Sequence, residues 1–152
     1  MMANSVFNLS DLNGTNGFAI NSINPNDLLS TSVSSAGDIN GDGIDDLIIG
    51  TDVASPNGKN SGQSYVVFGS KKGFNAQLKV STLNGTNGFT INGINPGDFL
   101  GRPVSNAGDI NGDGFDDLII MAKGASPNGK NSGQSYVVFG SKKDFSASFD
   151  LS

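Results

Sequence analysis

Short apolar runs separated by turn residues dominate the chain, and no window shows the 3.6-residue apolar period of a helix. The runs LIIG and YVVF are nearly continuous, which is typical of central strands covered on both faces. Between them, SPNGKNSG carries Pro, Asn-Gly and Ser-Gly, residues that favour turns and tolerate a positive φ. The pattern predicts an all-β protein of short antiparallel strands.

The strand pattern occurs twice. At an offset of 71, residues 9–73 match residues 80–144 at 49 of 65 positions, so the chain is a tandem repeat, with repeat 1 at about 9–79 and repeat 2 at about 80–150. The expected strands are 33–39, 46–51, 63–69 and 89–94 in one unit, and 104–110, 117–122, 134–140 and 18–23 in the other. Four strands per unit correspond to one blade of a β-propeller, so we interpret 1–152 as a single fragment with two blades.

The repeat is cut between its third and fourth strands. One blade, about 28–94, is continuous, whereas the other, 99–141, needs a fourth strand, which we expect from about 18–23. Propellers typically use about 4 to 8 blades, so two blades cannot surround an axis. We therefore predict that copies join head to tail into a ring, with a trimer giving six blades and a tetramer eight. A monomeric pair of incomplete blades is the alternative.

Two loops concentrate oxygen ligands. In each, positions one, three, five and nine carry Asp or Asn, position six is glycine, and position seven can offer its backbone carbonyl. The predicted metal ligands are Asp38, Asn40, Asp42, Ile44 and Asp46 in the first loop, and Asp109, Asn111, Asp113, Phe115 and Asp117 in the second. Because Ca²⁺ takes roughly six to eight oxygens, we predict two Ca²⁺ ions per chain. Asp45 and Asp116, at position eight, are expected to point outward.

These loops differ from EF-hand loops. An EF-hand needs a glutamate at position 12, where this chain has Ile49 or Ile120, and it needs flanking helices. Without a cation, three neighbouring carboxylates repel one another. Two alternatives stay open, namely a metal-free Asp/Asn/Gly turn and a magnesium site, although Mg²⁺ usually keeps several waters.

Composition removes several functional classes. Histidine and cysteine are absent and all 14 acidic residues are Asp, which excludes histidine bases, thiol nucleophiles, disulfides and Cys/His zinc sites. The net charge of −5, with lysine pairs only at 71–72 and 142–143, argues against nucleic acid or an anionic membrane as a partner. The start of the chain, MMANSVFNLS, lacks signal-peptide features, and no apolar run reaches the roughly 20 residues of a membrane span.

The stretch VSSAGDINGDGIDDLIIG, followed by ASP and GQSYVVFGS, resembles the FG-GAP repeat of integrin α-subunit propellers and their bacterial relatives. Phe68-Gly69 and Phe139-Gly140 match the Phe-Gly piece. The Gly-Ala-Pro piece stands as Ala54-Ser55-Pro56 and, in the second copy, as 124–127 (GASP), each with an extra Ser. The resemblance implies calcium ligands at all five loop positions of both copies. It also implies a ring that is usually seven-bladed, which two-blade units cannot tile.

Together, the loops and the resemblance predict a non-catalytic calcium-binding propeller module for structural assembly and for protein or glycan interaction. Extracellular calcium modules work at about 10⁻⁴ to 10⁻³ M calcium, so we expect an extracellular or cell-surface parent protein. One alternative is a hydrolase or lyase that uses Asp45 and Asp46 as acid and base. Another is a purely structural fragment with no ligand beyond calcium. Arg102, the one arginine, is expected to be a solvated charge or salt bridge, or a contact at the ring axis.

Overall fold

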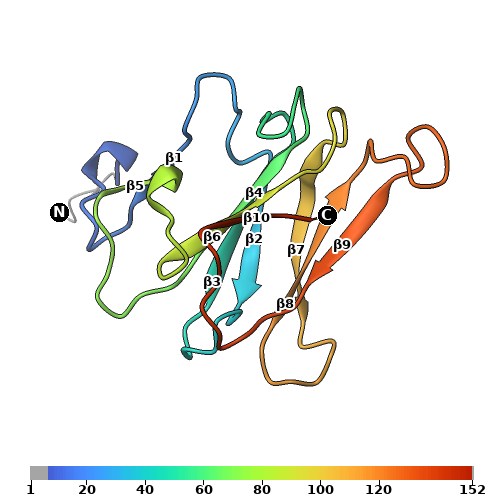
Figure 1. Ribbon diagram of the computed structural model, residues 1–152. Coiled ribbons are helices and arrows are strands. Elements are labelled where there is room, and N and C mark those ends of the chain that lie inside the picture. The colour runs from blue at the N-terminus through green and yellow to red at the C-terminus, as the bar shows by residue number, and fades with distance from the viewer. Residues whose placement is uncertain (1–6, 152) are drawn as a thin grey trace.

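The computed structural model describes residues 7–151, and its regular structure consists of strands and two single-turn 3-10 helices (Figure 1). The strands are β1 (Ala19–Asn21), β2 (Ser32–Gly37), β3 (Asp46–Thr51), β4 (Gln63–Val67), β5 (Gln77–Lys79), β6 (Gly88–Asn92), β7 (Leu100–Gly108), β8 (Asp117–Ala122), β9 (Gln134–Val138) and β10 (Ser148–Asp150), and the 3-10 turns are η1 (Leu9–Asp11) and η2 (Val80–Thr82). The all-β prediction is confirmed. Within the described residues, no helix has the length and apolar character needed to cross a membrane.

Five strands form the first sheet, in the order β10-β6-β4-β3-β2. Strands β2, β3, β4 and β6 are antiparallel neighbours, and they overlap the four strands expected within 28–94, of which three end two residues earlier than expected. The apolar runs pair with each other, for example Ile49 with Tyr65 and Val66 with Phe89. Strand β10 adds in parallel to the outer edge of β6, next to the end of the described chain.

The second sheet has three antiparallel strands in the order β7-β8-β9. Among residues 7–151, no strand pairs with the outer edge of β9. The segment 18–23, expected to supply that strand, contributes β1, which pairs in parallel with β5 at the far side of the first sheet (Figure 1). The second sheet is therefore not completed within the described chain, and completion from another copy stays a prediction.

The main core lies between the two sheets, which pack face to face. Ile48, Val66 and Phe89 of the first sheet meet Leu118 and Ile120 of the second, and all five side chains are fully buried. A smaller cluster covers the other face of the first sheet, where Ile49, Tyr65, Val67, Val80 and Leu83 pack together. Burial on both faces explains why β3 and β4 are nearly continuous apolar runs.

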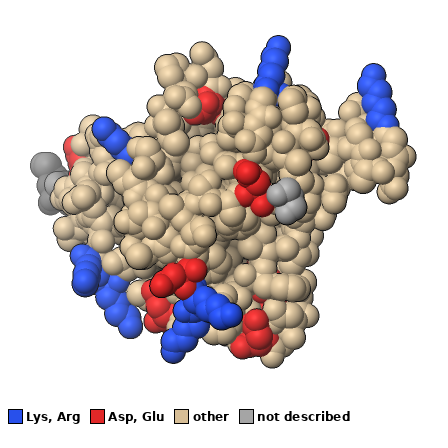
Figure 2. All heavy atoms as spheres, viewed as in Figure 1, with Lys and Arg blue, Asp and Glu red and all other residues tan. Residues whose placement is uncertain are grey.

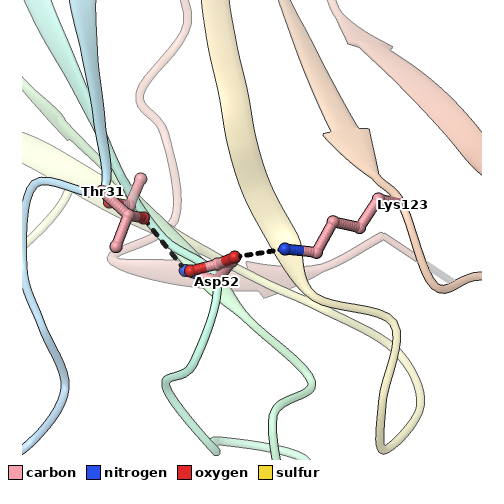
Figure 3. Close-up of polar contacts among 4 residues, drawn as sticks. Thr31, Asp52 and Lys123 are labelled. Carbon is pink, nitrogen blue, oxygen red and sulfur yellow. Dashed lines mark hydrogen bonds and ion pairs between the residues drawn. The ribbon is translucent and has the colours of Figure 1, made fainter.

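An ion pair joins the two sheets where β3 and β8 end (Figure 3). Lys123 Nζ lies 2.7 Å from Asp52 Oδ2, and the Asp52 side chain is only 4% exposed. The backbone N–H of Asp52 donates to Thr31 Oγ1 at 3.3 Å. The lysine also lies over the ring of Phe99, at 4.9 Å from its centroid. The contact therefore holds a buried carboxylate against a cation from the neighbouring sheet.

Replacing this cation tests the contact. Lys123→Met is expected to lower the free energy of unfolding by about 1–2 kcal/mol, because it leaves the Asp52 carboxylate buried without its partner. Urea unfolding measures the loss, and Lys142→Met, at an exposed lysine, serves as the matched control. Equal stabilities of the two variants would show that the ion pair contributes nothing.

Candidate metal centre

Both acidic loops lie at the same end of the two sheets, at the lower edge of Figure 1. Residues 38–45 connect β2 to β3, and residues 109–116 connect β7 to β8. The loops also touch each other, because the Asp38 N–H donates to Asp116 Oδ2 at 2.9 Å and the Asp116 N–H donates to the Asp38 carbonyl at 3.3 Å. The repeat thus places two candidate metal loops side by side.

The side chains at positions one, three and five of the first loop turn inward. Asp38 Oδ1 accepts from the Asp42 N–H at 2.9 Å, and Asp38 Oδ2 accepts from the Gly43 N–H at 2.8 Å. Asn40 Oδ1 accepts from the same Asp42 N–H at 2.9 Å. Asp42 Oδ1 accepts from the Ile44 N–H at 2.9 Å. The loop therefore winds around its own side-chain oxygens.

The second loop repeats this arrangement. Asp109 Oδ1 and Oδ2 accept from the N–H groups of Asp113 and Gly114 at 3.1 and 2.8 Å. Asn111 Oδ1 accepts from Asp113 at 2.9 Å, and Asp113 Oδ1 accepts from Phe115 at 3.0 Å. Since equivalent residues make equivalent bonds in both copies, the inward conformation belongs to the repeat and not to one local environment.

The aspartate at position nine is buried and ties each loop to the segment that follows β4 or β9. Asp46 Oδ1 accepts from the Gly69 N–H at 2.7 Å, and its Oδ2 accepts from the Ile39 N–H at 3.2 Å. Asp117 does the same with Gly140 and Ile110, at 2.9 and 3.0 Å. These glycines belong to the Phe-Gly pieces, and their partnership with position nine spans 23 residues, so sequence inspection alone missed it.

The Phe-Gly glycine also leaves no room for a side chain. A Cβ on Gly69 would lie 2.6 Å from the Asp45 carbonyl oxygen, and a Cβ on Gly140 would lie 2.3 Å from that of Asp116. The loop thus packs directly on the backbone after β4 or β9. A bulkier residue there would displace the donor that position nine needs.

Electrostatics in the first loop show its carboxylates acting on one another. The pKa of Asp46 is raised to about 6: burial is the largest cause, the charges of Asp42 and Asp38 also raise it, and the hydrogen bonds from Gly69 and Ile39 oppose the rise. A neighbouring cation would offset both the burial and the repulsion. The loop is therefore short of positive charge at position nine.

The ten predicted ligands are brought together loop by loop, but not into a finished cluster. Within residues 7–151, no three acidic side chains converge closely enough to form a ready metal-binding group. Each ionised carboxylate offers about four lone-pair positions, and the backbone N–H groups use only part of them. The donors are oxygen only, which fits a hard cation such as Ca²⁺.

The side chain at position seven of the second loop joins the two loops. The Phe115 ring packs on the first loop so closely that it leaves no room for a Cβ on Gly41.

The two aspartates at position eight differ. Asp45 is exposed, whereas the Asp116 carboxylate is half-buried, because it points away from its own loop and accepts from the Asp38 N–H of the adjacent loop. Asp45 and Asp46 also diverge, one lying in solvent and the other buried with both oxygens occupied. The two adjacent carboxylates therefore lie in different surroundings.

Two lysine side chains lie near the first loop, outside its ring of oxygen atoms. A surface hollow beside the loop is lined by Asn40 and Asp42 together with the exposed lysines Lys142 and Lys143. Figure 2 shows acidic and basic side chains alternating along the lower edge of the molecule. Arg102 is exposed and makes no ion pair with any residue in the described range.

Both loops lie in segments that are similar to known proteins. The family model of the FG-GAP repeat matches residues 30–67 and 104–138, which cover both loops, β2 and β3 around the first loop, and the end of β7 and all of β8 around the second. Integrin alpha-4 of Xenopus laevis is 31% identical to this chain over 114 residues, which are 75% of this chain and 10% of that protein. The chain thus spans about a tenth of the length of this relative. With its two matched segments, the chain belongs to the FG-GAP repeat family.

Proposed function

We propose that this chain is a calcium-binding, non-catalytic propeller module that serves structural assembly and the binding of a protein or glycan. The observation that carries the proposal is the duplicated loop, in which Asp, Asn and Asp at positions one, three and five turn inward in both copies. A metal-free turn would not require two carboxylates and an amide oxygen to turn inward at the same spacing in both copies.

The ligands are assigned from the donor set. In the first loop they are the side chains of Asp38, Asn40, Asp42 and Asp46 with the carbonyl of Ile44, and in the second Asp109, Asn111, Asp113 and Asp117 with the carbonyl of Phe115. A bound Ca²⁺ would neutralise carboxylates that otherwise repel one another and would cross-link the turn between two strands. Asp46 and Asp117, fixed by backbone N–H groups, set one side of each site.

The relative supports the wider role. Similarity to an integrin subunit favours an interaction module, and we place the parent protein outside the cell, where calcium is abundant enough for sites of about 10⁻⁴ to 10⁻³ M affinity. The divergence of Asp45 and Asp46 favours this role over a hydrolase or lyase. The protein or glycan ligand would contact surfaces other than these loops.

A calcium titration followed by amide NMR tests the metal assignment loop by loop. The N–H groups of Gly43 and Gly114, which donate to Asp38 and Asp109, are expected to shift saturably as calcium is added to chelator-treated protein. Asp42→Asn should weaken binding at the first loop on the order of tenfold or more, because one ligand charge is lost, while Gly114 responds as before.

The matched control for this titration is Asp45→Asn. It removes the same charge from the same loop at a position that is not a ligand, so both loops should still respond. No saturable shift at either glycine would refute calcium binding. Equal weakening by Asp42→Asn and Asp45→Asn would refute the ligand assignment and leave only a general charge effect.

A further inference from the structure

The outer face of the second sheet exposes side chains whose repeat equivalents, 71 residues earlier, lie buried between the sheets. Ile110 is 56% exposed, whereas its equivalent Ile39 is fully buried. The other exposed members of this face are Ile119, Val137 and Phe139, and their equivalents Ile48, Val66 and Phe68 are buried. This face therefore has the composition of an interior face without the sheet that would cover it.

The opposite end of the molecule shows the complementary pattern. Val33 is 63% exposed on the first sheet, whereas its equivalent Val104 is 5% exposed against that sheet. Leu47 is likewise exposed and its equivalent Leu118 buried. A hollow on this face is lined by Val33 and Leu47 together with Ile20 of β1. The two end faces are thus the two halves of the interface that the sheets already make with each other.

The strand edges at the two ends are complementary as well. The pair β1–β5 repeats the pair β6–β10, since Ala19 faces Gln77 just as Thr90 faces Ser148. Strand β1 therefore corresponds to β6, the fourth strand of a blade, and β5 lies on its outer edge as β10 lies on the outer edge of β6. The inner edge of β1 pairs with no strand among residues 7–151. Strand β9 has the reverse, an outer edge with no fourth strand.

We propose that a second copy of this chain fills this gap, with β1 of one copy adding to β9 of the next. The β4–β6 ladder, from Gln63 opposite Asn92 to Val67 opposite Gly88, supplies the register. Shifted by the repeat, it places Gln134 opposite Asn21 and Val138 opposite Gly17 across the joint. The joint is antiparallel and head to tail, so it propagates until a ring closes.

Side-chain hydrogen bonds support this register. Within the chain, Gln63 Nε2 donates to Asn92 Oδ1 at 2.7 Å, and Asn92 Nδ2 donates outward to Ser148 Oγ at 3.1 Å. Asn21 already donates outward to Gln77 at 3.5 Å, as Asn92 does to Ser148. Its Oδ1 then faces the place that the register assigns to Gln134.

Charge favours joining unlike ends. Asp52 and Lys123 occupy the same repeat position, so a contact between two like sheets would bring equal charges together. In head-to-tail order, each Lys123 lies between two Asp52 carboxylates, one in its own chain and one in the next copy. Asp45 gains a partner too, because its equivalent Asp116 accepts from the neighbouring loop and Asp45 would accept from Asp109 N–H of the adjoining copy.

The joint departs from its template at Met121, and also at Pro103, which lacks the hydroxyl through which its equivalent Ser32 accepts from the Val104 N–H at 3.1 Å. A Cβ on Gly50 would lie 1.8 Å from the Gly101 carbonyl oxygen, yet the equivalent of Gly50 is Met121. At the joint, Met121 of one copy would face Ser30 of the next copy, which is the repeat equivalent of Gly101. Because Met121 carries a side chain, Ser30 must lie further from β8 than Gly101 lies from β3. The strand joint and the apolar face are at the other residues and do not depend on these two positions.

Mass in solution gives the first test. Light scattering of the full chain in calcium-containing buffer is expected to give three or four times 15.6 kDa, for six or eight blades. A monomer would overturn the proposal, because both end faces would then be left to some other partner, such as a further repeat.

A disulfide placed across the joint tests the register. The chain has no cysteine, so Asn21→Cys with Gln134→Cys should form, on mild oxidation, disulfides between chains in most molecules and yield covalent trimers or tetramers on a non-reducing gel. Gln63→Cys with Asn92→Cys is the matched control, since it places the same pair within one chain and should give monomer bands only.

The gel also separates the alternatives. A disulfide that closes within one Asn21→Cys/Gln134→Cys chain would show β1 returning to its own β9 and would overturn the second copy as donor. Failure to cross-link while the Gln63→Cys/Asn92→Cys control succeeds would overturn the strand joint. The readout needs no bound metal, so it is independent of whether the loops bind calcium.

Discussion

Phe89→Ala is expected to lower the free energy of unfolding by about 3–5 kcal/mol, the range for removing a fully buried aromatic side chain. The Phe89 ring stacks on Phe145 with centroids 4.4 Å apart, and it lies 5.8 and 5.7 Å from the rings of Phe68 and Phe149. These partners come from the first sheet and from the C-terminal segment. The cavity left by the missing ring would therefore weaken the packing of that segment on the sheet. Denaturant unfolding monitored by circular dichroism gives the loss.

Phe7→Ala is the control for this substitution, because Phe7 is 59% exposed and the variant removes the same group from solvent. We expect its stability to lie within about 0.5 kcal/mol of the unaltered chain. Similar losses in both variants would contradict the placement of Phe89 at the centre of the core.

Asp117→Ala is expected to cost about 2–5 kcal/mol, because it leaves the N–H groups of Ile110 and Gly140 without an acceptor at a fully buried position. It should also abolish calcium binding at the second loop. Unfolding is measured in the presence of a chelator, so that the loss reports the hydrogen bonds alone.

Asp117→Asn separates the two roles of this carboxylate. Asparagine keeps one acceptor oxygen, so the chelated protein should lose about half as much stability as Asp117→Ala, while the calcium site loses a charged ligand in both variants. If Asp117→Ala folded as stably as the unaltered chain, the buried aspartate would not be the link between the loop and the segment that follows β9.

Sequence inspection located the central strands because their signals are local. The predicted 46–51 and 117–122 coincide with β3 and β8, whose apolar runs begin directly after the loop aspartate. By contrast, β5 and β10 were missed. Each is three residues long, QLK or SFD, and each exists only because it lies beside β1 or β6 in parallel. No local pattern signals such a pairing.

The site shows the same division. The inward oxygens of each loop follow from spacing within ten residues, so positions one, three and five could be predicted as a group. The bond from Gly69 N–H to Asp46 and the bond from Asp38 N–H to Asp116 join residues that the chain separates by 23 and 78 positions. They arise from how strands and sheets pack, which the repeat pattern alone does not specify.

The most direct test of the account is a count of bound calcium on the chelator-treated chain, by equilibrium dialysis against millimolar calcium. We predict two ions per chain, falling to one in Asp42→Asn and staying at two in Asp45→Asn. A count that remains at background throughout would contradict the account, since the duplicated loops would then be turns that hold themselves together by hydrogen bonds alone.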